Sequence, residues 1–189
     1  MNEFSVICRI LGSLYNRPPQ DPVLQPLFTL IKEGKLQAQW PLEQDELLKV
    51  LQTHCDPAEL EQDYQALFGG EHAAVSPYGE DWENGPQQQE VRDFLQQRGM
   101  PLTDARYDSI GMLLLATSWL EDQSQQDEVL AQFTLFDHYL LPWCGAFLGK
   151  TEAHARTPFY RTLAAVTRGA IQAMYEELAE QQESDPQPE

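Results

Sequence analysis

Apolar residues recur along most of this chain every three or four positions, which is the spacing of one face of an α-helix. The first stripe consists of Phe4, Ile7, Cys8, Leu11, Leu14 and Tyr15. Further stripes occupy residues 24–31, 47–55, 60–68, 91–95, 129–140 and 159–178. No convincing two-residue alternation of apolar and polar positions indicates a β-strand. The pattern predicts an all-α fold, with about eight or nine helices packed in a single domain.

Residues that favour helix ends stand at the edges of these stripes. An N-cap side chain is followed by a first-turn proline at Asp21 and Pro22, at Asp56 and Pro57, and at Thr157 and Pro158. Gly34 and Gly99 are placed to end helices, and residues 124–127 resemble a capping box. Pro142 falls within a helical stretch, where its missing backbone donor predicts a kink or a break.

The most apolar stretch, residues 110–120, is hydrophobic on nearly every side and is predicted to be the central buried helix. We expect this helix to open at Arg106, which places Asp108 in its first turn, where the helix dipole favours an acid. Thr103 or Asp104 would then be the N-cap. Asp108 can therefore be explained by helix stability alone, without a function.

The composition indicates a folded, acidic protein. With 42% hydrophobic residues among 189, the chain is long and apolar enough to bury a core. Its net charge of −18 argues against a nucleic-acid partner, because phosphate binding needs a basic face. The charge suits a basic partner, or simply keeps the protein soluble. Residues 1–182 are expected to form the domain, and residues 183–189, which are acidic and contain proline, a flexible tail.

Cysteine usage and the N-terminal sequence both favour the cytoplasm. Cys8, Cys55 and Cys144 are odd in number and far apart, and there is no Cys-x-x-Cys motif, as suits a reducing compartment. Residues 1–4 lack the basic region and the long apolar run of a signal peptide. No stretch is apolar for long enough to span a bilayer. We therefore expect a soluble, cytoplasmic protein without stable membrane insertion.

A long loop at residues 69–82 interrupts the helical pattern and carries glycines, Pro77 and two aromatic residues, Tyr78 and Trp82. A loop of this length is uncommon in a compact domain unless it has a function. Trp82 lies among acidic residues, where it could fold back into the core or remain exposed as an interface anchor. Both readings stay open, whereas Trp119 and Trp143 are expected in the core.

The sequence contains no recognisable catalytic or metal site. A Gly-x-x-x-x-Gly-Lys-Ser/Thr phosphate loop, a His-Glu-x-x-His zinc motif and a Gly-x-Ser-x-Gly nucleophile turn are all absent. His138 and Cys144 could approach each other, but a metal would need at least two more ligands, and none has suitable spacing. We therefore predict no enzymatic activity, no bound metal and no cofactor.

The order of these motifs resembles the TorD/NarJ family of redox-enzyme maturation chaperones. The family pattern is Tyr-x-x-Leu-Phe, a Pro-Tyr-x-Ser-x-aromatic loop, and Pro-x-Asp-His-Ile before a buried helix. The residues that fit are Tyr64, Leu67, Phe68, Pro77, Tyr78, Trp82, Asp108 and Ile110. Three positions depart from it: Glu80 replaces the loop serine, Arg106 the proline and Ser109 the histidine.

The resemblance extends over nearly the whole chain. Residues 136–147 match the family's Phe-x-x-His-Leu-x-x-Trp-x-x-x-Phe segment, and residues 159–164 match its closing Phe-Tyr helix. Residues 10–15, 40–42 and 119–122 look more specific, and they resemble the YcdY branch of the family.

The resemblance implies a single all-helical chaperone domain that binds a client metalloenzyme. It also implies a client-binding groove lined by Pro77, Tyr78, Glu80, Trp82, Asp108 and Ser109. The YcdY branch is thought to serve a zinc-dependent phosphohydrolase of the PHP class, so a client of that kind is favoured here.

Two other functions remain open from the sequence. The first is an escort for the twin-arginine signal peptide of a molybdenum oxidoreductase, against which the loss of the motif histidine at Ser109 counts modestly. The second is a weak nucleotide hydrolase, against which the missing phosphate loop counts. The sequence leaves open whether the protein is a monomer or a dimer.

Overall fold

A computed structural model of the chain describes residues 3–123 and 128–184. Over these residues the predicted all-α fold is confirmed, and only one isolated β-bridge interrupts the helices and loops. The elements are α1 (Glu3–Asn16), η1 (Pro22–Leu24), α2 (Gln25–Lys32), α3 (Lys35–Gln39), α4 (Asp45–Thr53), α5 (Pro57–Phe68), η2 (Gly79–Asp81), α6 (Gln88–Gln97), α7 (Ile110–Asp122), α8 (Glu128–Thr134), the π-helix η3 (Leu135–Leu140), α9 (Leu141–His154) and α10 (Pro158–Ser184).

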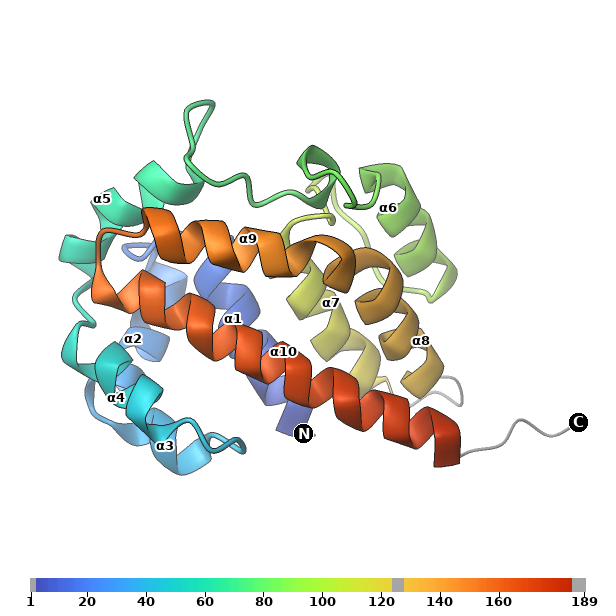
Figure 1. Cartoon of the computed structure of the whole chain (residues 1–189), viewed down its shortest axis with the longest axis horizontal. Coiled ribbons are helices and arrows are strands. Elements are labelled where there is room, and N and C mark those ends of the chain that lie inside the picture. The colour runs from blue at the N-terminus through green and yellow to red at the C-terminus, as the bar shows by residue number, and fades with distance from the viewer. Residues whose placement is uncertain (1–2, 124–127, 185–189) are drawn as a thin grey trace, which may run out of the picture.

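Helices α1 and α7 form the centre of the bundle, and α9 and α10 cross over them (Figure 1). Helix α7 is apolar on nearly every side, as predicted, and its buried residues include Ile110, Leu113 and Leu114. The small helices α2, α3 and α4 pack together at one end of the bundle, where α4 also contacts α10. None of the helices in the described ranges is long and apolar enough to cross a membrane.

Two glycines set the distance between the central helices. A Cβ atom at Gly12 would lie 2.9 Å from the carbonyl oxygen of Gly111, and one at Gly111 would lie 2.9 Å from Cβ of Asn16. Any side chain at these positions would therefore push α1 and α7 apart. Near the other end of the same pair of helices, the Ser5 hydroxyl lies 2.8 Å from the Ser118 hydroxyl, which adds a buried polar contact.

Aromatic rings fill the core on the side from which the long loop leaves. Phe68 stacks on Phe147 with ring centres 5.8 Å apart, and the Tyr64 hydroxyl donates to the backbone carbonyl of Tyr15. Tyr64, Leu67 and Phe68 are all buried, so the Tyr-x-x-Leu-Phe motif is a core motif. It also anchors the loop, because the Val75 amide donates to the Leu67 carbonyl at 2.8 Å.

Most of the predicted helix ends are confirmed. The side chains of Asp21 and Asp56 each accept a backbone hydrogen bond two residues on, and the Thr157 hydroxyl accepts one from Tyr160. Gly34 and Gly99 have positive φ angles of 76° and 84°, which suit glycine at the end of a helix. The capping box predicted at residues 124–127 lies outside the described residues.

At Pro142 the predicted disturbance of the helix is a kink: α8 continues through the π-helix η3 into α9, and α8 and α9 point in different directions (Figure 1). The wider π turn lets the chain pass a residue that cannot donate. The five-residue helix α3 was not predicted. Helix α10 runs to Ser184, two residues past the expected domain boundary at residue 182, and residues 185–189 are not described.

Candidate functional site

The long loop and the start of α7 are joined by a short piece of antiparallel backbone pairing. Tyr78 and Ser109 form the isolated bridge. The Gly79 amide donates to the Asp108 carbonyl at 2.8 Å, and the Ile110 amide donates to the Pro77 carbonyl at 2.9 Å. Residues 77–79 and 108–110 are far apart in the sequence but lie side by side. The structure thereby brings together the predicted site residues of the loop and of α7.

Asp108 holds this junction from beneath. It is fully buried, and its carboxylate accepts a hydrogen bond from the Glu80 amide at 3.1 Å. Both of its oxygens also accept hydrogen bonds from the guanidinium of Arg106, Oδ1 from Nε at 3.2 Å and Oδ2 from Nη2 at 2.9 Å. This paired, bidentate geometry is what a buried carboxylate requires. Asp108 therefore positions the loop and offers no surface of its own.

The sequence interpretation of Asp108 as a first-turn acid is wrong, because α7 begins at Ile110 and not at Arg106. Ser109 is the N-cap, and its hydroxyl accepts the Met112 amide at 3.1 Å. Thr103 and Asp104, the expected caps, precede the helix by several residues. The hydroxyl of Ser109 therefore serves as a helix cap, and the residue is buried.

Arg106 is the partly exposed side chain that covers the junction. Its Cζ atom lies 3.9 Å from the centre of the Tyr78 ring, and its Nη2 atom lies 3.3 Å from Oε2 of Glu80. A guanidinium over a tyrosine ring gains cation–π attraction in addition to its two ion pairs. Burial lowers the pKa of Arg106, but the hydrogen bond and charge of Asp108 more than offset this, so the pKa is raised. Sequence reasoning treated Arg106 as the start of the buried helix and as a departure from the family pattern, and gave it no part in the site.

Ser76 organises the other side of the loop. Its hydroxyl lies 2.6 Å from Oδ2 of Asp81 and accepts the Tyr78 amide at 3.2 Å. Its carbonyl accepts the indole N–H of Trp82 at 3.0 Å. Sequence reasoning missed this residue, although a serine directly before a proline is a common turn-forming signal.

Trp82 combines both of the readings that the sequence left open. One part of the ring packs on the core, with ring centres 6.3 Å from Trp143 and 6.2 Å from Phe147. The side chain is only half-buried, and the ammonium of Lys150 lies 5.6 Å from its ring centre. Trp143 is in the core as predicted, whereas Trp119 is only partly buried.

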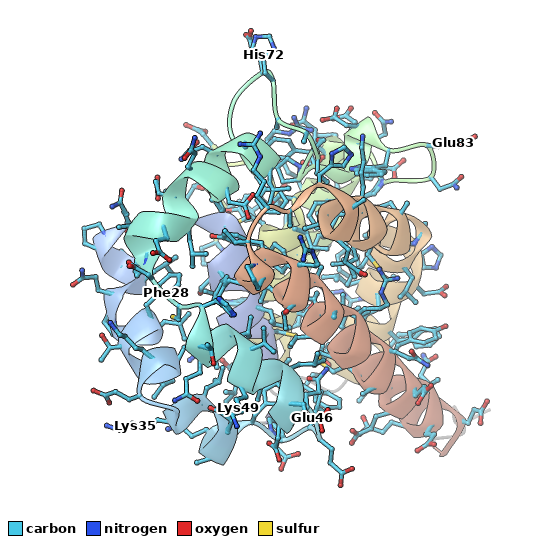
Figure 2. All side chains as sticks on the ribbon, turned by 60° about the vertical axis from the view of Figure 1, so that its left-hand side comes forward. Phe28, Lys35, Glu46, Lys49, His72 and Glu83 are labelled. Carbon is cyan, nitrogen blue, oxygen red and sulfur yellow. The ribbon has the colours of Figure 1, made fainter. Side chains whose placement is uncertain are left out.

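A cleft of about 440 Å³ opens beside this junction. Its lining residues are Phe68, Gly70, Glu71, Ala73, Ser76, Pro77, Tyr78, Asp81 and Arg106. It therefore combines an apolar floor with carboxylates and one paired arginine. Figure 2 places His72 at the tip of the loop, pointing away from the body of the protein, and Glu83 at a separate projection on the same side.

Two further features of the described residues are their potential metal ligands and their thiols. Over the part of the chain that the structure describes, no group of three or more His, Cys, Asp or Glu side chains is placed to hold a metal ion. The three cysteines are buried and unpaired. Burial raises the pKa of Cys144 to about 11 and that of Cys55 to about 12, so neither thiol is an activated nucleophile.

Comparison with known proteins agrees with the geometry. Residues 33–149 match the model of the family described as "Nitrate reductase delta subunit". The chain is 64% identical over 183 residues to "Chaperone protein YcdY" of Escherichia coli K12. The aligned residues cover 97% of this chain and 100% of that protein. It is 30% identical over 180 residues to "Tat proofreading chaperone DmsD" of Salmonella typhimurium, covering 88% of this chain and 86% of that protein.

These matches extend over the loop, the start of α7 and the helices that support them. They confirm the resemblance on which the site residues were predicted, and the named relatives are chaperones. The chain therefore belongs to the TorD/NarJ family of redox-enzyme maturation chaperones, and within it to the YcdY branch.

Proposed function

We propose that this protein is a chaperone that binds a client enzyme in the cleft beside Tyr78 and promotes the client's maturation. The observation that carries the proposal is the fixed junction between the loop and α7. Asp108 and the backbone bridge hold Tyr78 and Arg106 in place before any client arrives. A preorganised surface loses less conformational freedom on binding than a mobile loop would.

Some residues of the site would contact the client, and others would hold those residues in position. Pro77, Tyr78 and Arg106 line the cleft and would contact the client. Glu80 and Trp82 do not line it but each bonds to a lining residue, Glu80 to Arg106 and Trp82 to Ser76. Asp108 and Ser109 would act through the lining residues, one by holding the loop and the other by capping α7. The acidic side chains Glu71 and Asp81 favour a client segment that places basic residues beside apolar ones.

Chaperoning of this kind requires no covalent step. A protein that binds one client conformation more tightly than another raises the population of that conformation by mass action. We propose that the favoured conformation is the one competent to receive a metal ion. The action would take place in the cytoplasm, with the chaperone in solution.

For the client we favour a zinc-dependent phosphohydrolase of the PHP class, as the resemblance to the YcdY branch implies. The high identity to a YcdY protein over the whole length supports this choice. Ser109 counts modestly against the rival escort function, because it replaces the histidine of the family motif with a residue that cannot change its charge.

A second candidate is an escort for a twin-arginine signal peptide. It is favoured by the likeness to a Tat proofreading chaperone over 88% of this chain. A cleft with Glu71 and Asp81 on its walls also suits the two arginines of such a peptide. The nucleotide-hydrolase alternative is not proposed, since the named relatives are chaperones.

One experiment separates these candidates. The purified protein is mixed with a metal-free PHP-class phosphohydrolase and zinc, and in a parallel assay with a synthetic twin-arginine signal peptide. We expect a larger active fraction of the hydrolase and weak or no binding of the peptide. Tyr78→Ala should abolish the effect, whereas Tyr175→Ala, which removes a ring stacked on Phe133 away from the cleft, should not.

Peptide binding without an effect on the hydrolase would favour the escort. An effect on neither client, or an effect that survives Tyr78→Ala, would contradict the proposed site.

A further inference from the structure

A second polar hollow lies at the far end of α7 from the loop, where four helices meet. Its volume is about 60 Å³. Four carboxylates line it, one from each helix: Glu3 of α1, Glu121 of α7, Glu128 of α8 and Glu177 of α10. No lysine or arginine is among its lining residues. This concentration of negative charge has no part in the client cleft.

Glu121 is the unusual member of this group. Glu121 is only 4% exposed, and its Oε2 atom has no hydrogen-bond partner. A buried carboxylate oxygen without a donor is costly, and native structures rarely leave one in that state. Because the residue lines the hollow, a donor entering the hollow would satisfy it.

The surroundings of Glu121 disfavour its negative charge, and a positively charged donor would offset this effect. Burial, and after it the charges of Glu128, Asp122 and Glu177, raises the pKa of Glu121 to about 7, while the amino terminus acts in the opposite direction. The carboxylate of Glu128 is only partly occupied, by the Nε2 atom of Gln132 at 3.3 Å. Glu177 likewise receives one amide donor, Nε2 of Gln181 at 3.4 Å, and no donor reaches Oε2 of Glu121.

The geometry favours an amine over a metal ion. These carboxylates do not come close enough to form a metal-binding group in the described residues. A primary ammonium is compact, carries a full charge and has three donors, which can serve acceptors that are spread apart. The apolar side chains of Phe4, Val129 and Leu178 line the same hollow and would cover its alkyl stem.

We propose that this hollow binds a primary alkylammonium group, with Glu121 Oε2 as the central acceptor and the charges of Glu128 and Glu177 around it. The same chemistry is supplied by two sources, a free aliphatic diamine or the lysine side chain of a bound protein. The site is independent of the client cleft, since the two lie at opposite ends of α7.

The proposal is tested by calorimetric titration of the full-length protein with two probes, pentane-1,5-diamine and lysine capped at both its backbone ends. The hollow variants are Glu121→Gln and Glu177→Gln. Glu176→Gln is the matched control, because it removes the same charge from an exposed neighbour on α10 that does not line the hollow. We expect saturable binding that weakens about tenfold in the hollow variants, as for one lost charge-assisted hydrogen bond, and is unchanged in the control.

Each outcome decides the proposal. Binding of the capped lysine assigns the site to a partner's side chain, and binding of the diamine alone assigns it to a free amine. No saturable binding of either probe overturns the proposal, as does equal weakening in Glu176→Gln or equally tight binding of tetramethylammonium, which has no N–H donor. If Glu121→Gln fails to fold, as judged by circular dichroism, the exposed Glu177 decides the result through its own variant.

Discussion

The guanidinium of Arg106 covers the ring of Tyr78 at 3.9 Å while both of its paired bonds go to the buried carboxylate of Asp108. A partly buried aromatic residue of the proposed client cleft is therefore positioned by a residue that is fully buried. Tyr78 and Asp108 come from different segments, and Arg106 is the physical link between them. Changes at Asp108 should consequently reach the client through Arg106 and Glu80.

Asp108→Asn tests this link. The amide can no longer hold Arg106 as an ion pair, so the free energy of unfolding should fall by about 1–3 kcal/mol. The amides of Gly79 and Glu80 should also exchange with solvent faster, since both donate to Asp108. Urea denaturation and hydrogen exchange measure the two effects. Asp104→Asn, an exposed neighbour, serves as the control and should change neither.

A Trp82 substitution should affect folding and binding together. Trp82→Ala removes a half-buried ring from Trp143 and Phe147, so we expect a loss of about 1–3 kcal/mol of stability. If the open part of the ring contacts the client, binding weakens by a similar amount. Trp82→Phe should recover most of the stability. A variant with normal stability and lost client affinity would show that the contact with the core is unimportant.

The helix pattern and the local caps could be predicted because their causes lie within a few neighbouring residues. Asp56 accepts a bond from Ala58, and Gly34 ends a helix through its own φ angle. The start of α7 could not be predicted in the same way. Asp108 is drawn out of the helix by Glu80, a residue 28 positions away, and Ser109 then becomes the cap.

In the candidate site, too, some residues could be predicted from the sequence and others could not. The family motif pointed to Tyr78 and Trp82, but Arg106 gains its role only when the loop folds onto the segment before α7. Ser76 was missed although its contacts with Tyr78, Asp81 and Trp82 are all local. Glu121 was likewise one acid among many in the sequence, and only burial distinguishes it.

The crossing of the central helices gives a prediction about packing. Gly12→Ala places a methyl group 2.9 Å from the carbonyl oxygen of Gly111, so α1 and α7 must separate, at a cost of about 1–3 kcal/mol. Gly145→Ala is the matched control, because a Cβ at that helical position has nothing within 4 Å. It should stabilise the protein by about 0.5–1 kcal/mol. Thermal unfolding of both variants measures the contrast, and equal effects would contradict the close approach.

Glu121 should make stability depend on pH. Its pKa is raised from 4.5 in the unfolded chain to about 7 in the fold, by burial first and then by Glu128, Asp122 and Glu177, against the amino terminus. Between these values the folded protein holds a proton that the unfolded chain has lost. The contribution is therefore most favourable at low pH and is lost as the pH rises through 7.

Glu121→Gln removes this titration while keeping the shape of the side chain. Relative to the variant, the wild-type protein should lose roughly 2–5 °C of melting temperature between pH 5 and pH 8, given the usual sensitivity for a chain of this size. Glu176→Gln should follow the wild type, because its carboxyl is exposed. A difference that grows in the opposite direction would mean that Glu121 is held ionised in the fold. Adding an alkylammonium probe at pH 8 should restore part of the lost stability, since ligand binding to the folded state raises the melting temperature.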